Sequence, residues 1–227
     1  MPGIKERVQE KAGRIICNAL KPLIVPLFHN LYYSSTNWAE NTYLGYPILQ
    51  TPVDIQLYQE VIYKLNPETI IQTGIASGGS LLYFASLMDL IGQARTAKVI
   101  GVDITLTDQA KSIAHPRVTM LEGSSTDPKI VEQIKSMVIG KCMVVLDSDH
   151  SKSHVDKELS LYADLVSPGS YLAVEDTNVN GHPVSPTFGP GPREAVKQFL
   201  ATDKRFAQDR FWAKNLYSFH DWLKRLN

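Results

Sequence analysis

The chain has 227 residues, which is enough for one large domain with a substantial core. Its 23 basic side chains balance its 23 acidic ones, so net charge gives no reason to expect a nucleic-acid partner. The cysteines Cys17 and Cys142 are far apart in apolar surroundings, which argues against a disulfide framework and predicts a cytoplasmic location. No secretory signal is recognised, and the apolar stretch near Pro22 and Pro26 is too interrupted to span a bilayer.

Residues 1–50 are predicted to form an N-terminal extension. Apolar residues recur at helical spacing from Ile4 to about Leu20, which predicts an amphipathic helix. We expect this helix to dock on the domain or on a second copy, making a homo-oligomer, with membrane contact through its basic face as the alternative. The stretch 30–50 lacks periodicity and is expected to be irregular, with its aromatic side chains shaping a pocket: Trp38, Tyr43 and Tyr46.

Residues 51–227 are predicted to form the main domain, beginning with a helix at Pro52. Short apolar runs then alternate with helical stretches, which indicates an α/β fold with a doubly wound, mostly parallel sheet. The expected strands are 69–74, 98–104, 117–123, 142–147 and 170–176, and the expected helices are 79–91, 128–138, 153–165 and 193–201. A loop rich in glycine and proline at 177–194 is expected to be functional or a lid, and weaker strands are expected at 206–211 and 216–220.

Ligands of open parallel sheets bind beyond the carboxyl ends of the strands. The first run ends in a glycine-rich turn, where Gly74 and Gly78 allow close approach of a ligand, although the lysine of a phosphate-binding loop is missing. Asp103 ends the second run, where a carboxylate binds ribose hydroxyls in adenosine cofactors, or else caps the next helix. Ser124 and Ser125 follow the third run and either line an adenine site or cap a helix.

Carboxylates end the fourth and fifth runs, at Asp147 and at Glu175 and Asp176. Neighbouring parallel strands end at the same edge, so these charges are expected to converge and to repel unless a divalent cation lies between them. Oxygen ligands favour a hard divalent cation over Zn²⁺, either Mg²⁺ or an alternative such as Mn²⁺ or Ca²⁺. His150 comes three residues after Asp147, a suitable place for a general base, and Asp149 is expected nearby.

Several of these segments resemble the cephalosporin hydroxylase family, which also contains rhamnosyl O-methyltransferases. The resemblance runs from about residue 42 to the C-terminus, and "LDSDH" and "VEDTNVNGHP" are its most specific parts. It implies a Rossmann-like class I methyltransferase that uses S-adenosylmethionine and Mg²⁺. The family usually has an acid where this chain has Gln72. The resemblance implies that the methionine part of S-adenosylmethionine is surrounded by Gly74, Ser77, Gly78 and Ser80. It implies that Asp103 holds the ribose and that Ser124 and Ser125 lie by the adenine. It also implies that the metal ligands are Asp147, Glu175 and Asp176 and that His150 is the base.

The function expected from these features is methyl transfer to a hydroxyl group of a sugar, a glycolipid or a small natural product. Three alternatives stay open at this point. His and Asp clusters also bind non-haem iron in hydroxylases, and Asp103 alone does not separate S-adenosylmethionine from NAD. Gln72 leaves room for a non-catalytic subunit that binds the cofactor within a biosynthetic complex.

Overall fold

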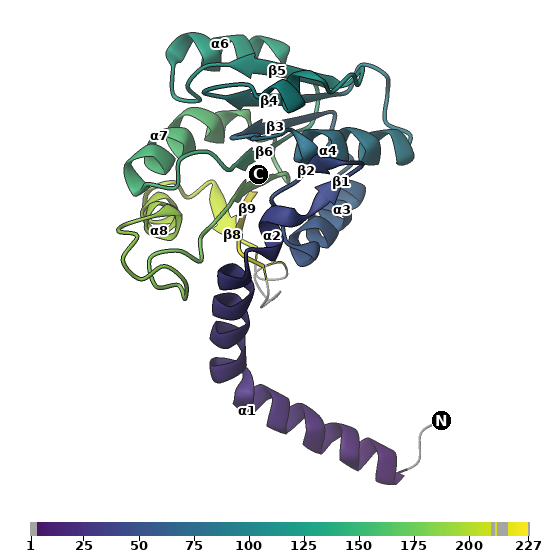
Figure 1. The fold of residues 1–227 in the computed structure, drawn as a ribbon, viewed down its shortest axis with the longest axis vertical. Helices are drawn as coiled ribbons and strands as arrows, with labels where there is room; N and C mark the ends of the chain where they lie inside the picture. Colours follow the sequence, from purple (N-terminus) through teal and green to yellow (C-terminus); the bar gives the residue numbers. More distant parts are fainter. Residues whose placement is uncertain (1–3, 210–211, 213–217, 227) are drawn as a thin grey trace.

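The computed structural model describes residues 4–209, 212 and 218–226, and its centre is a seven-stranded sheet covered by helices on both faces (Figure 1). The sheet has the order β5-β4-β3-β6-β7-β9-β8. Its first five strands are parallel, and β9 runs antiparallel to both of its neighbours. The strands are β3 (Thr69–Thr73), β4 (Lys98–Asp103), β5 (Val118–Glu122), β6 (Cys142–Leu146), β7 (Tyr171–Val174), β8 (Phe206–Gln208) and β9 (Asp221–Arg225). The predicted fold class is confirmed.

The central strands β3 and β6 are buried along their whole length, as expected for a parallel sheet enclosed between two helical layers. One apolar core lies beneath α3 (Pro52–Leu65) and α4 (Gly79–Leu90). The other lies beneath α6 (Pro128–Met137), α7 (Lys152–Tyr162) and α8 (Pro192–Thr202). Short elements complete the domain: α5 (Asp108–Lys111) and the 3-10 turn η1 (Ala163–Leu165). Trp222 of β9 is fully buried, and truncating a buried Trp to Ala typically costs about 3–5 kcal/mol.

Local signals in the sequence explain where the helices begin. Thr51 caps α3, since its hydroxyl accepts a hydrogen bond from the backbone N–H of Asp54, and Pro52 occupies the first turn. Asp127 caps α6 in the same way, ahead of Pro128.

The order of strands reverses beside β3, because β4 lies on one side of it and β6 on the other. That reversal opens a crevice at the carboxyl ends of these strands.

The N-terminal helix is longer than the sequence predicts. It does not end near Leu20, because α1 runs from Ile4 to Ser35 with Pro22 and Pro26 inside it. Figure 1 shows α1 bent and projecting from the domain, and proline inside a helix is a usual cause of such a bend. Its C-terminal end is held by ring contacts with Phe219, at 4.9 Å from His29 and 6.2 Å from Tyr32. The expectation that the segment up to Leu20 docks on the domain is wrong, because residues 11–20 are exposed.

The segment 30–50 is more ordered than expected. It contains the end of α1, the short helix α2 (Asn37–Glu40) and a hairpin of β1 (Thr42–Tyr43) and β2 (Tyr46–Pro47). The hairpin lies against the start of α4, where a side chain at Gly79 would come within 2.4 Å of the Pro47 carbonyl oxygen. The division of the chain at residue 50 stays a prediction.

The last two strands differ from their predicted bounds. β8 is shorter than 206–211 and ends at Gln208. The strand predicted at 216–220 falls partly on residues outside the described ones, and the described strand β9 begins only at Asp221. β8 pairs with β9, and β9 also pairs with β7, a segment distant in the chain, so local sequence carries little information on the limits of these strands.

Candidate active site

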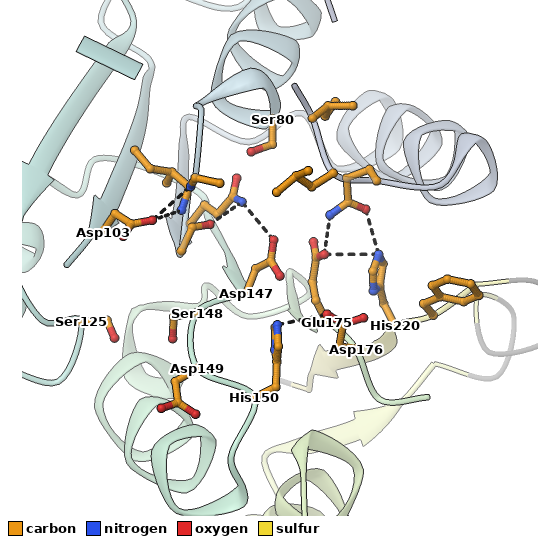
Figure 2. A pocket seen from close by; sticks show the side chains of 18 of the residues that line it. Ser80, Asp103, Ser125, Asp147, Ser148, Asp149, His150, Glu175, Asp176 and His220 are labelled. Atoms are coloured by element: carbon orange, nitrogen blue, oxygen red, sulfur yellow. Dashed lines mark hydrogen bonds and ion pairs between the residues drawn. The ribbon is translucent and has the colours of Figure 1, made fainter. Parts of the chain in front are cut away.

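A cavity of about 710 Å³ lies at the carboxyl ends of the parallel strands (Figure 2). Its walls come from the segments that follow β3, β4, β5, β6 and β7, from the N-terminal extension and from the segment before β9. The volume is within the range of small-molecule sites, and the position is the one that an open α/β sheet offers to its ligands.

The glycine-rich turn after β3 forms one wall. Gly74 has φ +69°, and a Cβ there would lie 1.9 Å from the carbonyl oxygen of Asp147, so only glycine fits. The carboxylate of Asp103 accepts hydrogen bonds from the backbone N–H groups of Ile75 at 2.8 Å and Ala76 at 3.0 Å. Asp103 therefore fixes this turn while also facing the cavity.

Most residues predicted to hold a cofactor line this cavity: Gly74, Ser80, Asp103, Ser124 and Ser125. Ser77 and Gly78 do not belong to its described lining, and Gly78 is the residue in a left-handed conformation that precedes α4. The backbone of Ile75 and Ala76 lies at the cavity instead.

Of the two serines after β5, Ser125 is held by α7. The Ser125 hydroxyl lies 3.1 Å from Nε2 of His154, and the Ser125 carbonyl accepts a hydrogen bond from the Tyr162 hydroxyl. His154 in turn lies 3.5 Å from buried Glu158, and this hydrogen-bonded carboxylate raises the pKa of the imidazole. His154 thus lines the cavity and supports Ser125 rather than facing solvent.

Three groups with metal-ligating atoms meet in the same cavity. Asp147, His150 and Asp176 each offer one atom, and these atoms all lie within 4.8 Å of one another. Nε2 of His150 is 3.0 Å from Oδ2 of Asp176. The pKa of Asp147 is raised well above its usual range by burial first and then by the negative charges of Glu175 and Asp176. A bound cation would reduce the repulsion between carboxylates that lie so close together.

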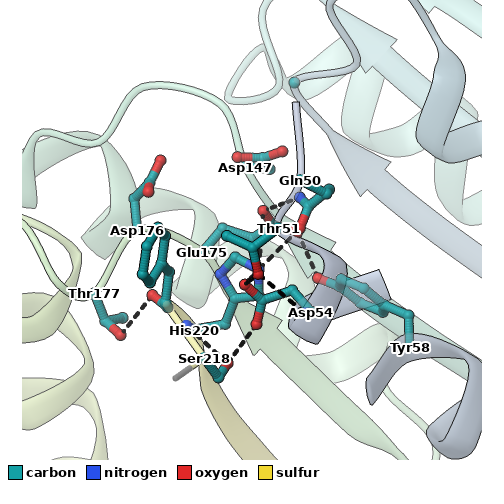
Figure 3. A network of polar contacts seen from close by, with 12 residues as sticks. Gln50, Thr51, Asp54, Tyr58, Asp147, Glu175, Asp176, Thr177, Ser218 and His220 are labelled. Carbon is teal, nitrogen blue, oxygen red and sulfur yellow. Dashed lines mark hydrogen bonds and ion pairs between the residues drawn. The ribbon is translucent and has the colours of Figure 1, made fainter. Parts of the chain in front are cut away.

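Glu175 is placed differently from Asp147 and Asp176, the two residues with which it was predicted to bind the metal. It does not belong to the group of three, and its carboxylate accepts hydrogen bonds from the Tyr58 hydroxyl and from Nε2 of Gln50 (Figure 3). His220 lies 3.5 Å from both Glu175 and Asp54. Burial raises the pKa of Glu175, whereas these two carboxylates raise the pKa of His220 against the effect of its burial. Glu175 thus faces the cavity from within a buried polar network.

Gln72 is buried at the end of β3, between Asp103 and Asp147, with 1% of its surface exposed. Its Nε2 donates to the Gly74 carbonyl at 2.9 Å and lies 3.5 Å from Oδ2 of Asp147. Its Oε1 has no hydrogen-bond partner within the described part of the chain, yet the residue lines the cavity. Buried acceptors are rarely left unpaired, so this oxygen suits a donor on a bound molecule.

The aromatic extension contributes to the cavity only in part. Trp38 lines it together with Tyr33, whereas Tyr43 packs edge-on against Tyr83 and the Tyr46 hydroxyl lies 3.2 Å from Ser112. The prediction that Tyr43 and Tyr46 shape the pocket is therefore wrong for this structure.

The long loop between β7 and α8 contributes none of its residues 177–192 to the cavity lining. His182 instead pairs with Glu194 of α8 at 2.7 Å. Hydrogen bonds from Gly191 and His182, opposed by burial, lower the pKa of Glu194 to about 2. The loop is thus tied to α8 rather than placed as a lid over the cavity.

Several lining residues were not predicted from the sequence, among them Gln50, Asp54, Phe219 and His220. Asp54 stands in the first turn of α3, where an acidic residue is common for local reasons. His220 precedes a strand whose position depends on pairing with β7. Asp54 is unusual only in being fully buried, and a sequence does not show burial.

Comparison with known proteins agrees with this arrangement. The family described as Rhamnosyl O-methyltransferase/CmcI matches residues 35–226. The rhamnosyl O-methyltransferase of Mycobacterium tuberculosis (strain ATCC 25618 / H37Rv) is 44% identical over 178 residues, covering 76% of this chain and 71% of that protein. The Mycobacterium leprae (strain TN) protein of the same name is 41% identical over 199 residues, covering 86% of each.

Solved structures show the same fold. An apo structure of CmcI-N160 has a TM-score of 0.66 and 22% identity, covering 83% of this chain and 77% of its own. A structure described as cmcI-D160 Mg-SAM has a TM-score of 0.65 and 20% identity, covering 83% and 78%. The family and the enzyme class expected from the sequence are confirmed: this chain belongs to the Rhamnosyl O-methyltransferase/CmcI family and is an O-methyltransferase.

Proposed function

We propose that this protein transfers a methyl group from S-adenosylmethionine to a hydroxyl group of a rhamnosyl residue, with Mg²⁺ bound beside the acceptor. The observation that carries the proposal is the meeting of Asp147, His150 and Asp176 in a cavity that Asp103 and the glycine-rich turn also line. Relatives more than 40% identical carry the name rhamnosyl O-methyltransferase. The solved structure with S-adenosylmethionine and Mg²⁺ supports the choice of both cofactors.

The side chains fit the expected cofactor. Asp103 stands at the end of β4, the position that binds ribose hydroxyls in nucleotide-binding sheets. Ser124 and Ser125 line the same cavity, and Gln72 offers an unpaired buried oxygen on β3, the strand between β4 and β6. An ammonium group on the amino-acid part of S-adenosylmethionine is a suitable donor to that oxygen.

The metal site is proposed at Asp147 and Asp176, and Glu175 stays a predicted third ligand. Carboxylate oxygens suit Mg²⁺. Each oxygen of Glu175 accepts one hydrogen bond from the protein and keeps a second lone pair. The group contains two carboxylates and one imidazole, whereas non-haem iron sites use two imidazoles and one carboxylate. This difference disfavours the hydroxylase alternative.

His150 is the proposed general base. Asp176, 3.0 Å from Nε2, orients the imidazole, which takes the proton of the acceptor hydroxyl. Bound Mg²⁺ would lower the pKa of that hydroxyl. S-adenosylmethionine would supply the methyl group on an electrophilic sulfonium. Trp38, Tyr33 and Leu49 line the cavity with apolar surface and help to exclude water from it.

The proposal is tested by incubating the protein with S-adenosylmethionine and a set of rhamnosides that differ in the free hydroxyl. We expect a methylated rhamnoside to form with Mg²⁺ and to stop forming when the metal is chelated. Product formation that continues in a chelator would contradict the metal role. Hydroxylation with Fe²⁺ and 2-oxoglutarate, or reduction of NAD, in place of methylation would contradict the reaction.

Gln72→Leu should weaken the binding of S-adenosylhomocysteine about tenfold or more, since a hydrogen bond to a charged group contributes about 1.5–3 kcal/mol. Methylthioadenosine lacks the amino-acid part, so its affinity should stay unchanged. Calorimetry with both ligands checks this result. The matched control is Gln133→Leu on the exposed side of α6, and equal losses for both ligands would rule out contact between Gln72 and the ammonium group.

Assembly and location stay predictions. None of the described helices is both apolar and long enough to cross a bilayer. Of the two free cysteines, Cys17 is exposed and Cys142 is buried, which is consistent with the cytoplasmic location proposed from the sequence. A homo-oligomer that forms through the N-terminal helix stays a hypothesis.

A further inference from the structure

α1 carries an exposed row of apolar side chains, called here the α1 apolar stripe: Ile16, Leu20, Leu23, Leu27 and Leu31. Their intervals of four, three, four and four residues place them on one face of the helix. Between 42% and 67% of each residue is exposed. The contacts of α1 with Phe219 are made by His29 and Tyr32 and leave the stripe open. A contiguous apolar face of this kind marks a docking surface.

The face opposite the stripe is basic. Lys11, Arg14 and Lys21 are exposed, and none of them forms an ion pair with another described residue. At 100° per residue they lie on the far side of the helix from Leu23 and Leu27. From residue 11 to residue 39 the chain has no acidic side chain, although basic and acidic groups balance over the whole sequence.

This charge distribution decides between two occupants of the stripe. Two copies of α1 packed through their stripes would bring together two segments, residues 11–35, that carry basic side chains and no carboxylate to offset them, because Glu6 and Glu10 both precede this stretch. An anionic lipid surface offers both an apolar layer for the stripe and negative charge for the basic side chains. Because α1 is not apolar enough to span a bilayer, it would lie in the plane of the interface.

α1 also leads directly to the cavity. Tyr33 in its last turn lines the cavity and stacks on Trp38, another lining residue, with ring centroids 5.8 Å apart. Leu49 and Ile104 line the same cavity and are exposed. Aromatic and apolar side chains at the end of an amphipathic helix suit the boundary between water and lipid.

We propose that α1 docks on an anionic lipid surface, with the stripe inserted between the lipids, and thereby holds the cavity next to the membrane. The docking is independent of the reaction proposed above, so a failure of one leaves the other standing. It needs only the exposed stripe, the one-sided basic charge and the position of Tyr33.

Sedimentation of the full-length protein with lipid vesicles tests the proposal. We expect binding to vesicles that contain phosphatidylglycerol, weak binding to pure phosphatidylcholine, and loss of binding in high salt. The double change Leu23→Gln and Leu27→Gln should lower the bound fraction at least about tenfold, since it removes two inserted side chains. Leu90→Gln, on an exposed leucine at the end of α4, is the matched control and should bind like the wild type.

A second variant separates docking from helix stability. Changing Lys11, Arg14 and Lys21 to glutamine leaves the stripe intact and should still abolish binding to anionic vesicles. Unchanged binding by this variant, or no vesicle binding by the wild type, would overturn the proposal. So would a wild-type dimer that Leu23→Gln and Leu27→Gln convert to a monomer, because the stripe would then bind a second copy.

Discussion

Asp147→Asn should lower the turnover of methyl transfer at least about a thousandfold, the largest effect expected from any single change in the cavity. The asparagine keeps the shape of the side chain and removes a charge from a group of three whose ligating atoms lie within 4.8 Å of one another. Mn²⁺ binding, followed by electron paramagnetic resonance as a probe for the Mg²⁺ site, should be lost. S-adenosylhomocysteine should still bind when no metal is present, because Asp103 and Gln72 are untouched.

The matched control is Asp149→Asn. Asp149 is exposed, and its carboxylate accepts a hydrogen bond from the Ser151 N–H at 2.7 Å, which is the first cause of its lowered pKa. It lies outside the group of three, so its variant should retain Mn²⁺ binding and turnover within a few-fold. Full activity of Asp147→Asn in the presence of a chelator would remove the metal from the mechanism.

His150→Gln should lower turnover about 10²–10⁴-fold, the usual contribution of a general base. The amide fills a similar volume and does not take up a proton, so the acceptor hydroxyl keeps its proton as the methyl group approaches. The Michaelis constant for S-adenosylmethionine should change little, because His150 lies beside Asp176 and apart from Asp103 (Figure 2).

Metal binding distinguishes the two roles open to His150, whose imidazole lies 3.0 Å from Asp176. A general base predicts a Mn²⁺ affinity within about threefold of the wild type. A loss of affinity as large as that of Asp147→Asn would instead identify His150 as a metal ligand. His154→Gln is the control, since His154 supports Ser125 at the other end of the cavity and should affect cofactor binding first.

The residues at the tips of the parallel strands were predictable because strand direction alone determines where they lie. Asp103, Asp147 and Asp176 each follow a short apolar run, and parallel neighbours must present them at one edge of the sheet. Gly74 was predictable for a related reason, since a chain that turns sharply from a strand into a helix needs a glycine where backbones approach closely.

The role of Glu175 was less predictable, although its position was correct. Its surroundings come from Gln50, Tyr58 and His220, which stand 125, 117 and 45 residues away along the chain. No local pattern marks them as partners. The length of α1 was missed for another reason, because prolines at 22 and 26 usually end a helix and here lie inside one.

The sequence by itself determined the alternation of strands and helices, the parallel sheet and the convergence of acidic residues at one edge, because these follow from the period of apolar residues and from strand direction. Only the tertiary structure decided which polar side chains surround Glu175, why Gln72 keeps an unpaired oxygen, and that the stripe on α1 lies open. Those features arise from contacts between distant segments, and burial, which sets their energies, is a property of the packed chain rather than of any local stretch.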